Sequence, residues 1–212
     1  MSRPTWILAA LLAACAYLVG LTLDMFWLRL LTKPLPVLAL AAWVVRHGDR
    51  RVAFGLLAGA VGDVCLVLPH AFLPGMIAFA LGHAAYVWAF WSWHRKPAWA
   101  GLPLVFGYIG LCFALMVEGT GPLTIPVAVY MLVIGAMIWR ATACAEDAER
   151  SPAARWLPFA GALLFGFSDT LIGLNKFVQP LSGATYPILL TYWAGQALIA
   201  AGAVQRGRPE PR

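Results

Sequence analysis

Runs of apolar residues separated by short polar connections dominate this chain. A helix needs about 20 residues to cross the hydrocarbon of a bilayer. Eight runs approach that length, at about 6–23, 30–45, 52–69, 72–92, 102–117, 122–139, 156–174 and 186–204. The second run is the weakest, because Lys33, Pro34 and Pro36 interrupt it near its start. The pattern predicts an all-α integral membrane bundle of eight transmembrane helices.

The composition fits the same class of protein. Of the 212 residues, 62% are hydrophobic and 11% are charged, which is too little polar surface for a soluble domain of this size. The net charge of +6 would suggest nucleic acid in a soluble protein. Here the basic residues lie between apolar runs, so we expect contact with the headgroups of bilayer lipids and no nucleic-acid partner.

The connections that carry lysine and arginine predict the orientation, because cytoplasmic loops are enriched in both. With the N-terminus in the cytoplasm, the opposite side holds only three basic residues, Arg29, Lys33 and Lys176. The cytoplasmic side then holds twelve: Arg3, Arg46, Arg50, Arg51, Arg95, Lys96, Arg140, Arg150, Arg155, Arg206, Arg208 and Arg212. We therefore expect both termini in the cytoplasm, a cytoplasmic tail at 205–212, and a bacterial inner membrane as the location.

The first twenty residues also imitate a signal peptide, and Leu12-Ala13-Ala14-Cys15 resembles a lipoprotein cleavage box. Because the apolar run continues to Leu23 and further spans follow, we expect this segment to stay as the first transmembrane helix. The four cysteines show no paired spacing, and only four histidines are present. The sequence therefore predicts neither a disulfide framework nor a metal site.

Two aspartates, Asp63 and Asp169, lie inside apolar spans. An acid near the bilayer centre costs about 2.5–3.5 kcal/mol on insertion scales, so it marks a functional site by default. Seven residues after each acid comes a basic residue, His70 or Lys176, on the same helical face. If the two acids meet in one cavity, one stays protonated while the other is ionised, as general acid–base chemistry requires. The alternative is two unrelated acids, each hydrogen-bonded to a neighbouring helix.

A weak internal repeat accompanies the two acids, which lie 106 residues apart. Each acid-bearing span is followed by a span with polar groups at mid-depth. These groups are His83 and Tyr86 in the first case and Tyr192 and Gln196 in the second. We expect a single membrane domain over 1–212, with two parallel four-helix halves at about 1–93 and 98–204. Chance similarity between apolar helices is the alternative.

Five segments resemble the YhhN-type lysoplasmalogenase family and occur in the family's order. They are AVGDVCLVL (60–68), FALGHAAYVWAF (79–90), IPVAVYMLV (125–133), GALLFGFSDTLIGLNKF (161–177) and TYWAGQALI (191–199). The resemblance covers nearly the whole chain, and Lys33-Pro34 resembles an early basic–proline element of the family. It implies an eight-helix membrane hydrolase that cleaves the vinyl ether bond of lysoplasmalogens. Asp63 and Asp169 are then the candidate catalytic acids.

The chemistry of the bond agrees with two carboxyl groups. Hydrolysis of a vinyl ether begins with protonation of the carbon distal to oxygen and passes through an oxocarbenium ion. A neutral acid can supply the proton, and an ionised one can stabilise the cation and activate water, as in glycoside hydrolysis. No metal or organic cofactor is needed. The expected partners are a lysophospholipid substrate and bilayer lipids, with no obligate protein partner.

Seven further residues are candidates for substrate binding. Lys33 and Lys176 either hold the substrate phosphate or anchor the helix ends. Asn175 either binds the substrate beside these lysines or caps a helix end. His83, Tyr86, Tyr192 and Gln196 either line a pocket or link helices by hydrogen bonds.

A proton-coupled transporter is the main rival, because it too needs buried carboxylates and often has repeated halves. The sequence lacks clear helix-breaking motifs at matched mid-span positions, which favours the hydrolase.

Overall fold

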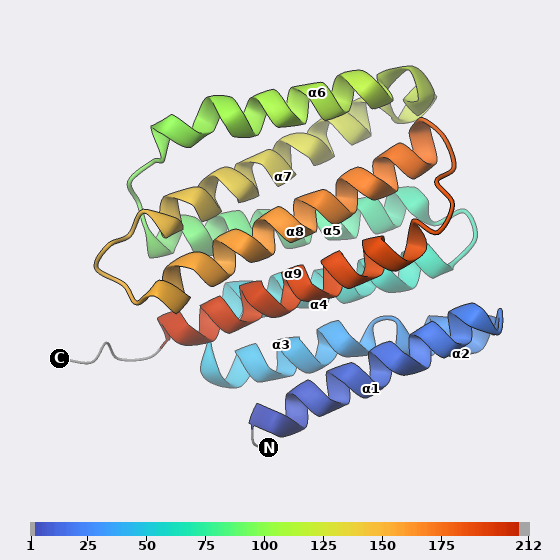
Figure 1. Ribbon diagram of the computed structural model, residues 1–212, viewed down its shortest axis with the longest axis horizontal. Coiled ribbons are helices and arrows are strands. Elements are labelled where there is room, and N and C mark those ends of the chain that lie inside the picture. The colour runs from blue at the N-terminus through green and yellow to red at the C-terminus, as the bar shows by residue number, and fades with distance from the viewer. Residues whose placement is uncertain (1–2, 208–212) are drawn as a thin grey trace.

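The computed structural model of the protein describes residues 3–207. In that part of the chain, long α-helices run back and forth side by side and no β-strand occurs (Figure 1). The helices are α1 Arg3–Thr22, α2 Phe26–Thr32, α3 Leu35–His47, α4 Arg50–Val67, α5 Phe72–Trp93, α6 Leu102–Thr120, α7 Thr124–Ala145, α8 Pro152–Phe177 and α9 Thr185–Arg206. Two short 3-10 helices, Trp99–Gly101 and Gly121–Leu123, precede α6 and α7. The predicted all-α class is confirmed.

Several of these helices are long and apolar enough to cross a membrane. Within the described residues, five segments meet that test, namely Phe26–His47, Phe72–Trp93, Trp99–Ala145, Pro152–Phe177 and Thr185–Arg206. The third, of 47 residues, contains both α6 and α7, which run in opposite directions (Figure 1). Large apolar side chains cover the outside of the bundle; Leu104 is 78% exposed and Ile125 is 76% exposed. Such a surface suits lipid, so the chain is an integral membrane protein.

The second predicted span differs from the expectation of one helix at 30–45. It consists of α2 and α3, which are separated at Lys33 and Pro34. Proline has no amide hydrogen to donate to the preceding turn, so the helical hydrogen bonds are interrupted at Pro34, although Lys33 before it keeps helical backbone angles. The break leaves the Lys33 side chain buried at 8% exposure, inside the bundle rather than at its surface.

Glycines allow two helix pairs to approach closely. A Cβ atom added to Gly82 on α5 would lie 2.9 Å from the carbonyl oxygen of Gly55 on α4. On the other pair, a Cβ atom added to Gly195 on α9 would lie 2.9 Å from the carbonyl oxygen of Gly161 on α8. Small residues at such crossings let the backbones of membrane helices pack directly against each other. These contacts fix the distance between the helices that carry the two aspartates and their neighbours.

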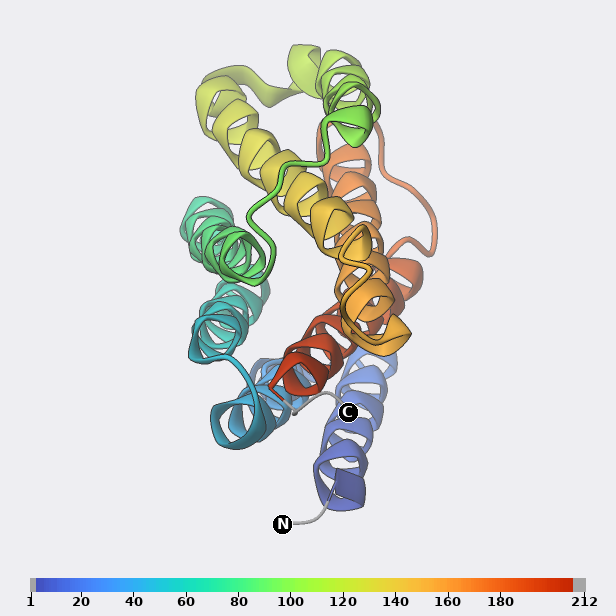
Figure 2. The same ribbon diagram turned by 90° about the vertical axis from the view of Figure 1, so that its left-hand side faces the viewer.

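The two views place α1 and α6 at opposite edges of the bundle, with α4, α5, α8 and α9 between them (Figures 1 and 2). The connections α3–α4, α5–α6 and α7–α8 lie at the same end as both termini (Figure 1). At that end, Arg206 donates hydrogen bonds to Asp147 at 3.1 Å and to the Trp93 carbonyl at 3.2 Å. The tail predicted at 205–212 lies outside the described residues from position 208 onward.

Candidate active site

Asp63 lies one turn before the end of α4 and is 1% exposed. Its Oδ2 atom accepts a hydrogen bond of 2.8 Å from the hydroxyl of Tyr192 on α9. The tyrosine ring is held edge-on against Phe79 on α5 and Phe165 on α8, with ring centroids 5.8 and 5.2 Å away. A buried carboxyl group needs such a donor, because leaving it without a partner costs free energy. The contact joins the two halves of the chain.

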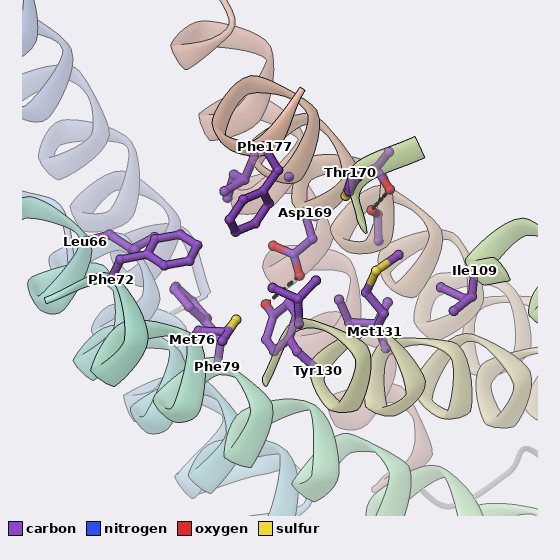
Figure 3. A pocket seen from close by; sticks show the side chains of 16 residues that line it. Leu66, Phe72, Met76, Phe79, Ile109, Tyr130, Met131, Asp169, Thr170 and Phe177 are labelled. Carbon is purple, nitrogen blue, oxygen red and sulfur yellow. Dashed lines mark hydrogen bonds between the residues drawn. The ribbon is translucent and has the colours of Figure 1, made fainter. Parts of the chain in front are cut away.

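Asp169 lies in the C-terminal half of α8 and has its own donor. The hydroxyl of Tyr130 on α7 donates a hydrogen bond of 2.8 Å to Asp169 Oδ2 (Figure 3). The Nε2 atom of His83 on α5 lies 3.8 Å from the same oxygen. His83 is 0% exposed, and neither ring nitrogen has a hydrogen-bond partner among the described residues. A polar ring left unpaired in a buried position is unusual and places a proton-carrying group beside the acid.

Both aspartates line one cavity of about 540 Å³. The cavity opens among α1, α4, α5, α8, α9 and the turn between α2 and α3, and its polar lining includes Lys33 and Lys176. The remaining lining residues are Tyr17, Leu66, Phe72, Phe79, Ser168, Ile172, Asn175, Thr185, Ile188, Leu189 and Tyr192. Two acids, two lysines and two tyrosines therefore share a space of the size that ligand pockets have. Each acid keeps a separate tyrosine donor.

A second, smaller pocket of about 60 Å³ borders the cavity and is lined mainly by apolar side chains (Figure 3). It includes Met131 and Ile134 on α7 and Met116 on α6. Five residues line both spaces: Leu66, Phe72, Phe79, Asp169 and Ile172. Asp63 and the two lysines line only the polar cavity and not the apolar pocket. Asp169 therefore stands at the boundary between a polar space and an apolar one.

Residues 28–203 match the model of the YhhN family. The chain belongs to the YhhN family. It is similar to the human lysoplasmalogenase TMEM86B, with 37% identity over 97% of this chain and 89% of that protein. It is also similar to the human lysoplasmalogenase TMEM86A, with 35% identity over 86% of this chain and 81% of that protein. A lysoplasmalogenase of Mycobacterium tuberculosis is 33% identical over 77% of this chain and 65% of that protein. No solved structure matches the chain.

Four of the seven predicted binding residues line the cavity of this YhhN-family chain. They are Lys33, Asn175, Lys176 and Tyr192. The Asn175 side chain also accepts a 2.7 Å hydrogen bond from the Leu181 amide, so it fixes the loop after α8. The Lys176 ammonium lies 4.3 Å from the centre of the Phe72 ring. Both residues thus combine a structural contact with a position at the cavity.

The other three, His83, Tyr86 and Gln196, are buried between helices and line neither space. The hydroxyl of Tyr86 donates a 2.6 Å hydrogen bond to Gln196 Oε1, which links α5 to α9. This is the interhelical alternative that the sequence left open for both residues.

The expectation that His70 shares a helical face with Asp63 is wrong. Since α4 ends at Val67, His70 lies in the following loop with a positive φ of 62°.

Sequence reasoning missed Tyr130, the hydroxyl donor to Asp169. Its signal was a single tyrosine within the otherwise apolar segment IPVAVYMLV. It also missed Ser168 and Tyr17, which line the cavity. Within residues 3–207, no group of three or more His, Cys, Asp or Glu side chains is arranged to hold a metal ion. The chemistry available at the cavity is that of carboxyl, ammonium and hydroxyl groups.

Proposed function

We propose that this protein hydrolyses the vinyl ether bond of lysoplasmalogens and releases a fatty aldehyde and a glycerophospho-base. Its relatives in the YhhN family carry the name lysoplasmalogenase. The observation that carries the proposal is that Asp63 and Asp169, both buried in apolar helices, line one cavity. The same relatives favour a hydrolase over a transporter.

In the proposed reaction, a carboxylic acid protonates the alkenyl carbon distal to the ether oxygen. The electron pair of the double bond forms the new C–H bond and leaves an oxocarbenium ion. Water then adds to the carbon next to oxygen and loses a proton to the second carboxylate. The resulting hemiacetal gives its hydroxyl proton to the first carboxylate and forms the aldehyde C=O bond, while its bond to the glycerol oxygen breaks and that oxygen takes the proton held by the second carboxyl group. The sum consumes one water and returns both acids to their starting states.

We assign the proton donor to Asp169 and the base to Asp63. Asp169 borders the apolar pocket, where the hydrocarbon side of the double bond would lie. Lys33 interacts electrostatically with Asp63, and a nearby cation favours the ionised form of an acid. Tyr130 and Tyr192 hold the two carboxyl groups in position. Lys33 and Lys176 line the cavity where they can bind the substrate phosphate.

The test is aldehyde release by purified protein that is given a lysoplasmalogen. We expect Asp63→Asn and Asp169→Asn to abolish release while the folded yield stays near wild type. Asp24→Asn is the matched control, because that side chain is 88% exposed. Aldehyde release that persists in both site variants would reject the assigned roles. A wild-type protein that is inactive on every vinyl ether but transports substrate into liposomes would support the transporter.

We also propose eight crossings with both termini in the cytoplasm. The alternation of helix directions and the basic residues at the terminal end support this topology. Single cysteines at Glu149 and Gln179, in a variant without native cysteines, test it. An impermeant maleimide applied from outside should label position 179 and spare position 149.

The proposed repeat of 1–93 and 98–204 gains support from helix packing. Asp63 follows Gly55 by eight residues, and Asp169 follows Gly161 by the same number. Both glycines form the close crossings described above. In addition, α5 contacts α7 and α9 contacts α3, so the last helix of each proposed half touches the second span of the other half. We propose a pseudo-twofold axis along the membrane normal.

A further inference from the structure

The apolar pocket beside Asp169 is small and lies against one face of α8. Its lining on that helix includes Gly166, three residues before Asp169, and Phe177, eight residues after it. Its volume is about 60 Å³. A small space with apolar walls beside the candidate acid admits the part of a hydrocarbon chain next to the double bond and excludes bulky groups.

On the α8 side of the pocket, two glycines add no side-chain bulk, and the one threonine hydroxyl is already hydrogen-bonded within the protein. A Cβ atom at Gly173 would lie 2.6 Å from the Met116 sulfur, and one at Gly166 would lie 2.8 Å from Ile138. The Thr170 hydroxyl already has hydrogen-bond partners. It donates to the Gly166 carbonyl at 2.9 Å and shares a hydrogen bond of 2.6 Å with the Tyr108 hydroxyl. The α8 wall therefore offers little to a polar ligand.

The direction of the pocket follows from the helices that line it. Ile134 lies four residues further along α7 than Tyr130, which is about 6 Å towards the predicted cytoplasmic end. Ile109 on α6 also lies on that side of the pocket, and Figure 3 shows it away from Asp169, beyond Met131. Both isoleucines are buried. They bound the pocket at its inner end.

We propose that this pocket is the subsite for the hydrocarbon chain of the substrate and that Ile109 and Ile134 set the preferred chain length. The proposal rests on the hydrolase function above and adds an orientation to it. The phosphate end lies in the polar cavity, the double bond lies beside Asp169, and the chain runs inward between α6, α7 and α8. The length of chain that fits is set by the distance from Asp169 to the two isoleucines.

The test uses a series of lysoplasmalogens that differ only in alkenyl chain length. Ile134→Phe fills the inner end, so we expect kcat/KM to fall about tenfold or more for long chains relative to short ones, the size of a methylene effect in an apolar pocket. Ile134→Ala extends the pocket and should shift the preference towards longer chains. Ile125→Phe is the matched control on the same helix, because Ile125 is 76% exposed to the outside. It should leave the preference unchanged.

A binding measurement separates this proposal from the proposed function. The probes are 1-O-alkyl lysophospholipids of the same chain lengths, which lack the reacting double bond, and the readout is protection against thermal unfolding in detergent. Opposite shifts of the preferred length in the two Ile134 variants would support the subsite, even if the wild type released no aldehyde. An unchanged preference in Ile134→Ala would overturn the subsite, whether or not hydrolysis occurs. The alanine variant adds no volume, so the test does not depend on the folding of Ile134→Phe.

Discussion

The Tyr192 hydroxyl lies 2.8 Å from Asp63 Oδ2, and this hydrogen bond connects α9 to α4 across 129 positions of the sequence. The corresponding bond from Tyr130 to Asp169 joins α7 to α8. Each candidate acid is thus held by a tyrosine from another helix. The two donors have different neighbours: Tyr130 has the His83 ring centroid 5.5 Å away, whereas Tyr192 packs on Phe79 and Phe165.

We expect Tyr192→Phe and Tyr130→Phe each to lower kcat about tenfold to a hundredfold, with little change in KM. Phenylalanine keeps the ring packing and removes only the hydroxyl. A hydrogen bond to a charged group contributes about 1.5–3 kcal/mol, and about 1.4 kcal/mol corresponds to a factor of ten. Asp63 is charged as the base, and Asp169 becomes charged as it gives up its proton. Steady-state aldehyde release measures both constants. Tyr186→Phe serves as the control, because that side chain is exposed. Wild-type kcat in both variants would mean that the tyrosines do not position the acids.

Lys33→Met and Lys176→Met should raise KM for a lysoplasmalogen about tenfold. Lys176→Met should leave kcat within a fewfold, whereas Lys33→Met should also lower kcat, because it removes the cation beside Asp63. Methionine retains an unbranched apolar stem and loses the charge that would pair with the phosphate. The decisive comparison uses an alkenylglycerol without a phosphate group as the substrate. Its KM should be the same for wild type and variants. An equal rise in KM on both substrates would assign the lysines a structural role.

Gly161→Ala should destabilise the protein, because the added Cβ atom would lie 2.7 Å from the carbonyl oxygen of Gly195. The obstacle is backbone, which cannot move aside without separating α8 from α9, and overpacking of this kind costs about 1–3 kcal/mol. Gly110→Ala is the matched control, since no atom lies within 4 Å of its added Cβ. The control should be neutral or stabilising by up to about 1 kcal/mol. Thermal unfolding in detergent distinguishes the two, and equal melting temperatures would contradict the close crossing.

Asp49 caps α4 outside the membrane-spanning segments. We expect its charge to stabilise the fold at neutral pH and to lose that effect in acid. Burial alone would raise the pKa of this carboxyl. However, hydrogen bonds from the Arg51 side chain, the Trp93 indole and the Arg51 amide outweigh burial and hold the pKa below its ordinary value. A lowered folded-state pKa means that the stabilisation is present above the unfolded value of about 3.9 and is lost as the pH falls towards the folded value.

Asp49→Asn keeps the cap and removes the charge, so it should lower the melting temperature at pH 7. The difference from wild type should stay constant down to about pH 5 and shrink below about pH 4. Melting curves of both proteins across that range provide the measurement. Glu149→Gln, at an exposed loop position, is the control. A difference that persists unchanged at pH 3 would show that the charge of Asp49 contributes nothing.

The order of apolar and polar residues by itself determined the all-α class, the membrane setting and the positions of the helices. This is because a chain in lipid must satisfy its backbone hydrogen bonds within each helix. It also singled out Asp63 and Asp169, since an acid in an apolar span is costly wherever the helix packs. The ends of the helices were less certain: Lys33 and Pro34 gave a break where one span was expected, and α4 ended before His70.

Only the tertiary structure decided which side chains meet. The rotation and tilt of each helix depend on close packing at residues such as Gly55 and Gly161, which no single span encodes. That packing brings Tyr130 to Asp169, while it pairs Tyr86 with Gln196 away from the cavity. It also places Asp169 between a polar cavity and an apolar pocket. This boundary is a property of several helices together, because each of them contributes only one strip of its wall.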